Sequence, residues 1–230
     1  MDLTAGLFAW AFEIWPSYTS AIVLASLLIS LLFAPLIVVE VRQEARRMRH
    51  ARRYRTGDRQ LDRAFMLRDV FTGPLLALKA FRGLLQASAA VLVFVTVMGF
   101  SQLDPDNGGG PRYLEQDTAL WLRLRDTGGE LPLGRVDLAR SAYSALQEDG
   151  FGAAVAHSVI PLALMALYLV RLIRFGAPDG MAVRIVIALA ISLLTPGAFV
   201  LYLITVLVAN TGVMLIARRT PAGGVFVGRS

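Results

Sequence analysis

Five long runs of apolar residues alternate with polar segments along the chain. The runs cover residues 21–39, 83–100, 151–170, 181–194 and 198–217. A helix needs about 20 mainly apolar residues to cross the hydrocarbon core of a bilayer, and every run except the short fourth one approaches that length. Apolar residues fill each run instead of forming the stripe of a soluble amphipathic helix. The pattern predicts an all-α integral membrane protein with five transmembrane helices.

The polar segment at 40–72, between the first and second runs, is rich in arginine and has the pattern of two helices joined by a turn at 56–58. We expect it to form a basic helical hairpin. Lys and Arg beside a span stay on the cytoplasmic side, so the hairpin is cytoplasmic and the N-terminus lies outside. The acidic segment at 101–150 is then external, and five spans place the C-terminus inside.

The remaining segments complete the expected domain organisation. Residues 1–16 contain Trp10 and Trp15 but no Lys or Arg, which indicates an interfacial amphipathic helix and not a cleaved signal peptide. Residues 17–219 form the transmembrane core, within which 75–82 is expected to lie along the interface before the second span. Residues 220–230 are expected to be a flexible cytoplasmic tail.

The external loop at 101–150 carries shorter patterns of its own. We expect small helices at 113–126 and 136–148, lying on the outer surface without forming an independent domain. The three glycines at 108–110 are followed by a proline, which indicates a linker. Pro35 lies inside the first span and is expected to kink that helix.

Composition narrows the chemistry that this chain can perform. The sequence is 56% hydrophobic and has a formal net charge of +6, two histidines and no cysteine. Disulfides and thiolate metal sites are excluded, and the sequence lacks a catalytic constellation, so we expect neither an enzyme nor a cofactor. The positive charge is typical of cytoplasmic loops in a membrane protein, with anionic lipid or ribosomal RNA as the other partners of such charge; DNA is not expected.

Polar side chains inside the spans are the main candidates for a functional site. The set comprises Ser26, Ser30, Gln86, Thr205 and Asn210. Such residues commonly hold membrane helices together by hydrogen bonds. If several of them converge, they line a partly hydrated groove instead.

Several motifs follow one another in an order that points to a known family. They are the first span with Pro35, the basic hairpin, the sequence Gly73-Pro74-Leu75-Leu76, the third span with Pro161, and the sequence Pro196-Gly197-Ala198-Phe199-Val200-Leu201-Tyr202. Over residues 18–219 the chain resembles the YidC/Oxa/Alb family of membrane protein insertases. The resemblance assigns Pro35, Pro74, Pro161, Pro196, Gly197 and Tyr202 to structural motifs.

The resemblance implies a five-helix core around a hydrophilic groove that is open to the cytoplasm and to lipid. A protein of this kind inserts and folds nascent membrane proteins in the bacterial cytoplasmic (inner) membrane, alone or beside the Sec translocon. The five polar span residues named above would line the groove. The ribosome, clients or anionic lipids would meet the basic residues Arg46, Arg47, Arg49, Arg52 and Arg53.

The chain also departs from the family pattern. Ser30 stands where bacterial members usually carry a groove arginine, Leu203 stands where tryptophan is frequent, the hairpin is short, and the large periplasmic domain of Gram-negative members is absent. Two other functions therefore stay open. One is a small transporter or channel subunit, for which intramembrane charges or discontinuous helices are typical; the other is a scaffold whose basic hairpin binds lipid or a partner.

Overall fold

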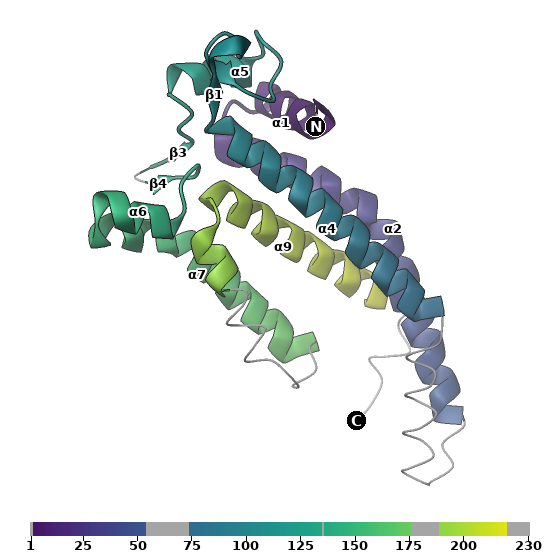
Figure 1. The fold of residues 1–230 in the computed structure, drawn as a ribbon. Helices are drawn as coiled ribbons and strands as arrows, with labels where there is room; N and C mark the ends of the chain where they lie inside the picture. The colour runs from purple at the N-terminus through teal and green to yellow at the C-terminus, as the bar shows by residue number, and fades with distance from the viewer. Residues whose placement is uncertain (1, 54–73, 135, 176–188, 220–230) are drawn as a thin grey trace. The chain divides into compact units, whose positions relative to one another are not determined.

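The computed structural model describes residues 2–53, 74–134, 136–175 and 189–219 (Figure 1). Four long helices account for most of this part: α2 (Tyr18–Arg53), α4 (Pro74–Phe100), α7 (Phe151–Phe175) and α9 (Gly197–Arg219). By length and composition each of the four can cross a membrane, as the sequence predicts for its first, second, third and fifth spans. The described part is therefore built as a multi-pass helical membrane protein.

Three predicted segments fall wholly or partly outside the described residues. Of the fourth span, 189–194 is described and is helical. Of the hairpin at 40–72, the first arm is described and continues α2 as far as Arg53. Residues 54–72, 181–188 and the tail at 220–230 lie outside the described part.

The long helices begin and end farther out than the apolar runs. Helix α2 is continuous through Pro35. Helix α4 starts at Pro74, so the expectation of a separate interfacial segment at 75–82 is wrong. The first turns of α4 carry Lys79 and Arg82, and both pair with glutamates of α2. Lys and Arg are good helix formers, so the helix continues through them, and the glutamates of α2 supply their counter-charges.

The chain divides into two compact units. The first unit comprises Met1–Leu28 and Ala90–Val208, and the second comprises Ile29–Ala89 and Ala209–Ser230. The first unit contains α1 (Asp2–Ile14), all small elements of the 101–150 segment, and α7. The second contains the basic end of α2, the start of α4 and the end of α9.

In the first unit, the triple-glycine segment forms a hairpin, so the expectation of a linker is wrong. Strand β1 (Leu103–Asp104) pairs antiparallel with β2 (Gly110–Pro111), and the short helix η1 (Pro105–Asn107) lies between them. The turn uses positive φ angles of 63° at Gly108 and 76° at Gly109, which glycine adopts without strain. A Cβ atom added to Gly110 would lie 2.1 Å from Nε1 of Trp121, so this position has no room for a side chain.

The two small helices of the 101–150 segment are present but shorter than expected. Helix α5 (Ala119–Asp126) begins after Thr118, whose side chain accepts a hydrogen bond from the Trp121 N–H. Helix α6 (Ala142–Asp149) begins after Ser141, which forms a capping box with Ser144. These N-caps satisfy helix N–H groups and thereby set the starting points.

Residues at the start of the second expected helix belong to a strand. Strand β3 (Pro132–Leu133) pairs antiparallel with β4 (Val136–Asp137). The Asp137 carboxylate accepts hydrogen bonds from the N–H groups of Leu131, at 2.8 Å, and Ala139, at 2.9 Å. A carboxylate that bonds nearby backbone in this way competes with helix formation, so α6 starts five residues after Asp137.

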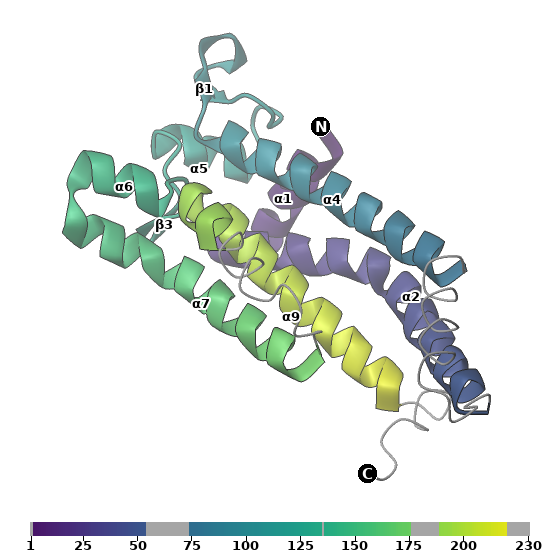
Figure 2. The same cartoon turned by 60° about the horizontal axis from the view of Figure 1, so that its bottom comes forward.

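Helix α1 packs against the rest of the first unit. Its Phe8 is fully buried and meets Phe100 edge to face, with ring centroids 5.6 Å apart. Thr4 is hydrogen-bonded to Thr96 of α4 at 2.9 Å between the hydroxyl oxygens. Helix α1 also lies beside α5, as Figures 1 and 2 show. Trp10 and Trp15 are exposed.

The start of α9 is held by the same external segment. The Gly197 N–H donates to the Arg140 carbonyl at 3.1 Å, and the Ala198 N–H donates to the Leu138 carbonyl at 2.8 Å. Nearby, the Arg140 guanidinium pairs with Asp149 and Glu148 of α6. Desolvation of the guanidinium lowers the pKa of Arg140, but the attraction of these two carboxylates outweighs this effect and raises the pKa above its usual value.

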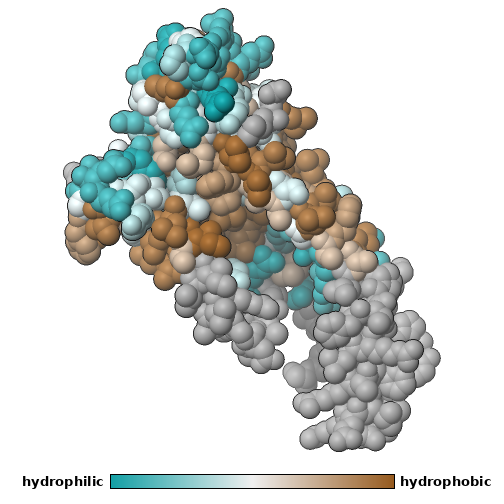
Figure 3. Space-filling model, in the orientation of Figure 1, coloured by the Kyte–Doolittle hydropathy of each residue, from teal (hydrophilic) through white to brown (hydrophobic). Residues whose placement is uncertain are grey.

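Helix α7 has one buried and one exposed face. His157, Pro161 and Leu164 are buried, whereas Val155, Val159 and Leu162 are exposed. Figure 3 shows hydrophilic residues gathered over α5 and α6 and hydrophobic residues along α7. An apolar exposed face on a long helix is suited to contact with lipid tails.

Candidate functional site

Two facing helices of the second unit share a network of charges. Glu40 Oε2 of α2 lies 3.1 Å from Arg82 Nη1 of α4, and Glu40 Oε1 lies 3.8 Å from Lys79 Nζ. Lys79 Nζ is also 3.6 Å from Glu44 Oε1. The side chains of Glu40 and Arg82 are 12% and 21% exposed, so their contact is largely shielded from solvent. We call these four residues the ion-pair network.

An apolar cluster joins α2 to α9 in the same unit. Ile37, Val41 and Ala217 are buried together, and Val38, Val213 and Met214 pack against them. The ion-pair network holds α4 to α2, and this cluster holds α9 to α2. Helix α2 therefore contacts both α4 and α9 in the second unit.

Each of these three helices carries an uncharged amide side chain with one atom shielded from solvent. Gln43 Oε1 of α2, Gln86 Nε2 of α4 and Asn210 Oδ1 of α9 are shielded from solvent and have no hydrogen-bond partner among the described residues. The oxygen and nitrogen of an amide can be exchanged in such an assignment, so each of these residues has one shielded amide atom without a hydrogen-bond partner among the described residues. We call Gln43, Gln86 and Asn210 the amide set.

Two members of the amide set lie near the middle of an apolar helix. Gln86 is on the span Ala77–Phe100, and Asn210 is on the span Gly197–Arg219. Along α4, Gln86 is four residues beyond Arg82, which is about 6 Å in a helix. A buried polar group without a hydrogen bond costs about 1–3 kcal/mol. Water or a bound polar segment would satisfy these amides.

The five polar residues proposed as a groove lining divide between the two units. Ser30, Gln86 and Asn210 belong to the second unit, and Ser26 and Thr205 belong to the first. Ser26 and Thr205 are buried, and their hydroxyls donate to the carbonyls of Ile22 and Leu201 in their own helices. This is the bonding expected of hydroxylated residues that pack between helices. Ser30 is buried, with 2% of its surface exposed.

The structural motif residues occupy varied positions. Pro35 is exposed on α2, and Pro74 is the first residue of α4, where a missing N–H costs nothing. Pro161 is fully buried on α7. Pro196 precedes α9, and Gly197 begins it against Leu138, whose Cδ2 would be 3.2 Å from an added Cβ. Tyr202 is buried and stacks on Phe199 at 5.7 Å between ring centroids.

The basic residues of the predicted hairpin begin on the last turns of α2. The helix backbone is described for Arg46, Arg47, Arg49, Arg52 and Arg53, and the surroundings of their side chains lie outside the described part. Their assignment to ribosome, client or lipid contacts stays a prediction.

Sequence reasoning missed the ion-pair network and Gln43. Glu40 and Glu44 are four residues apart, and Lys79 and Arg82 are three apart, so each pair lies on one face of a helix. These spacings indicate a charged face on each helix that could pair with the other. The ion-pair network was missed because 40–72 and 75–82 were expected to lie outside the spans.

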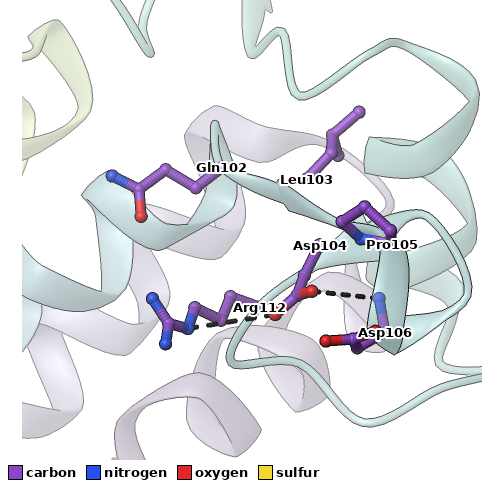
Figure 4. A pocket seen from close by; sticks show the side chains of 6 residues that line it. All are labelled: Gln102, Leu103, Asp104, Pro105, Asp106 and Arg112. Carbon is purple, nitrogen blue, oxygen red and sulfur yellow. Dashed lines mark hydrogen bonds and ion pairs between the residues drawn. The ribbon is translucent and has the colours of Figure 1, made fainter.

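The described residues offer few alternatives to this site. They contain no group of three or more His, Cys, Asp or Glu side chains that could hold a metal ion. An open hollow of about 360 Å³ lies in the first unit and is lined by Gln102, Leu103, Asp104, Pro105, Asp106 and Arg112 (Figure 4). There Asp104 accepts from the Asp106 N–H at 3.0 Å and pairs with Arg112 at 3.9 Å. These contacts cap η1 and support the hairpin.

Comparisons with family models, curated proteins and solved structures give no match for this chain.

Proposed function

We propose that this chain is a membrane protein insertase and chaperone of the bacterial cytoplasmic membrane, as the resemblance to the YidC/Oxa/Alb family implies. The observation that carries the proposal is the amide set, in which each residue has a shielded amide atom without a hydrogen-bond partner among the described residues of the second unit. In this proposal Ser30, Gln86 and Asn210 line a hydrated groove that opens to the cytoplasm beside the ion-pair network.

The contacts of the first unit support the proposed topology. Helix α1 touches α5 of the 101–150 segment, and the start of α9 is bonded to Leu138 and Arg140 of that segment. The N-terminus and the start of α9 would then share the external side with this acidic loop. The ends of α2 and α9 are basic, as cytoplasmic ends should be. A topology of five spans, with an external N-terminus and an internal C-terminus, agrees both with the external start of α9 and with the cytoplasmic ends of α2 and α9.

The proposed mechanism shortens the dry path that a client must cross. Moving a charged residue to the bilayer centre costs about 2.5–3.5 kcal/mol on insertion scales. Buried amides that hold water or bond the client lower the barrier for its polar tail. The apolar helix of the client passes into lipid, and its burial supplies the driving force without hydrolysis.

One observation favours a second candidate, an ion-conducting transporter or channel subunit. Glu40, Lys79 and Arg82 lie within helices that are long and apolar enough to span a membrane, and intramembrane charges often mark ion pathways. Here each charge has an opposite partner, which also suits a structural role.

The test is insertion into liposomes that contain the purified protein. A single-span client is added from outside, and its protection from protease is compared with that in protein-free liposomes of the same lipid and salt. We expect greater protection with the protein. The double variant Ser30→Ala with Asn210→Leu should reduce it, whereas Ser88→Ala, at an exposed position of α4, should not.

Other outcomes separate the competing functions. Ion flux across the same liposomes without client protection would favour the transporter. Binding to anionic lipid with neither flux nor protection would favour the scaffold. Either result, from protein shown to be folded, would overturn the insertase proposal.

A further inference from the structure

Four charged side chains that are described in the second unit are matched with one another. Two carboxylates, of Glu40 and Glu44, face two cations, of Lys79 and Arg82. The other cations of this unit whose side chains are described lie at exposed or terminal positions: Arg42 and Arg219 are exposed, and Arg218 is in the last turn of α9. Among these described side chains, a charged segment beside the network would have to displace an existing ion pair to obtain a counter-charge.

The amide set offers a different kind of contact. A glutamine or asparagine side chain carries two N–H donors and a carbonyl acceptor without net charge. Gln43, Gln86 and Asn210 each have a buried amide atom without a partner in the described part of the chain. Such a set can both give hydrogen bonds to a polar segment and accept them from it.

Two of the amides, Gln86 and Asn210, lie farther into the apolar part of α4 and α9 than the charges of those helices, whereas Gln43 lies between Glu40 and Glu44 on α2. Gln86 is one turn beyond Arg82 on α4. Asn210 precedes Ala217 by seven residues, about 10 Å along a helix, and Ala217 packs beside Ile37 and Val41. A segment that has passed the ion-pair network therefore meets neutral amides along α4 and α9.

We propose that this site selects clients whose translocated segment is polar but uncharged, rich in Asn, Gln, Ser or Thr. The inference rests on the proposed insertase function and names its substrate class. A neutral polar segment can exchange its water for hydrogen bonds to the amide set. An acidic or basic segment loses its water at the same place and finds no free counter-charge beside the amides among the described side chains.

The experiment uses the full chain in phosphatidylethanolamine–phosphatidylglycerol liposomes and three clients with one apolar span in common. The clients differ only in a short N-terminal segment, which is uncharged polar, acidic or basic. Protease protection is followed over time. We expect the uncharged segment to cross about tenfold faster than either charged one, a ratio that corresponds to about 1.4 kcal/mol.

Variants test whether the amides cause the selection. Gln86→Leu with Asn210→Leu should lower the rate of the uncharged client to that of the charged clients. Gln86→Met, which keeps the side-chain length, is a milder variant for use if the double variant unfolds. It should reduce the ratio of the insertion rates of the uncharged and charged clients. Ser88→Leu is the matched control on the exposed side of α4 and should leave the ranking of the clients unchanged.

The outcomes separate this inference from the function on which it rests. Equal insertion of all three clients, or faster insertion of the acidic one, overturns the selectivity and leaves the insertase function standing. If the amide variants lower the insertion rates of all three clients by the same factor, the amides have a general role in hydration, and this result also overturns the proposed selectivity. If none of the clients is protected above the protein-free level, the insertase function itself fails.

Discussion

Glu40 of α2 and Arg82 of α4 form the closest ion pair between these two helices, with 3.1 Å between Oε2 and Nη1. Both side chains are mostly shielded, and their geometry is that of an ion pair without a regular hydrogen bond, because Glu40 Oε2 has no hydrogen-bond partner among the described residues. Arg82 thus depends on Glu40 for its counter-charge, whereas Lys79 can also use Glu44.

This relationship predicts unequal effects of two similar substitutions. Glu40→Gln should lower the free energy of unfolding by about 1–3 kcal/mol, because it leaves the partly buried Arg82 unpaired. Glu44→Gln should cost about 0–1 kcal/mol, since Glu44 is 38% exposed and exposed pairs contribute little. Thermal unfolding in detergent measures both. Equal losses would show that Glu40 and Arg82 are not coupled, and a double-mutant cycle with Arg82→Gln checks this directly.

The packing of α1 predicts a second contrast. Phe8→Ala should destabilise the protein by about 3–5 kcal/mol, because Phe8 is fully buried against Phe100. Trp10→Ala, on the same helix, should stay within about 0.5 kcal/mol in detergent, since Trp10 is 46% exposed. Unfolding temperature and protease sensitivity of the N-terminus report the difference. If the two variants behave alike, α1 does not pack as described.

The contact between Gly110 and Trp121 predicts a steric effect. Gly110→Ala should cost about 1–3 kcal/mol, because an added Cβ overlaps the indole and the hairpin or α5 has to move. Trp121 fluorescence follows that movement in a background where Trp10 and Trp15 are replaced by Phe. Gly152→Ala is the control: an added Cβ there has no described atom within 4 Å, and alanine favours a helix. An unchanged Trp121 signal would refute the close contact.

The proposed topology can be checked by labelling single cysteines, because the chain has none of its own. Glu115→Cys, in the 101–150 segment, should react with a membrane-impermeant maleimide in intact cells. Arg219→Cys, at the end of α9, should react only after the cells are permeabilised. Both positions are exposed, so burial does not limit the reaction. Labelling of both from outside would contradict an odd number of spans between them and the proposed orientation.

Much of the helical framework was predictable because apolar runs of membrane length leave few structural choices. A backbone in lipid must satisfy its own hydrogen bonds, which a helix does within one segment. Runs at 21–39, 83–100, 151–170 and 198–217 therefore became parts of α2, α4, α7 and α9. Their ends were less predictable. Helix α4 runs through Lys79 and Arg82, which are good helix formers, and pairs them with glutamates that are distant in sequence.

The small elements of the 101–150 segment illustrate the same limit. Gly108, Gly109 and Gly110 have the composition of a linker, and only the tertiary position of Trp121 shows why Gly110 has no room for a side chain. Asp137 carries no local signal for a strand; its carboxylate bonds Leu131, six residues away. Contacts of this kind depend on where the chain returns to itself.

For the candidate site, the sequence by itself determined which polar residues lie in apolar helices, Gln86 and Asn210 among them, because such residues stand out against hydrocarbon-length runs. Only the tertiary structure decided which of them keep hydrogen-bonding capacity. The hydroxyls of Ser26 and Thr205 donate hydrogen bonds to carbonyls of their own helices. Gln86 and Asn210 each have an amide atom without a hydrogen-bond partner in the described part. Burial and hydrogen bonding depend on neighbours that are distant in sequence, and periodicity carries no information about those neighbours.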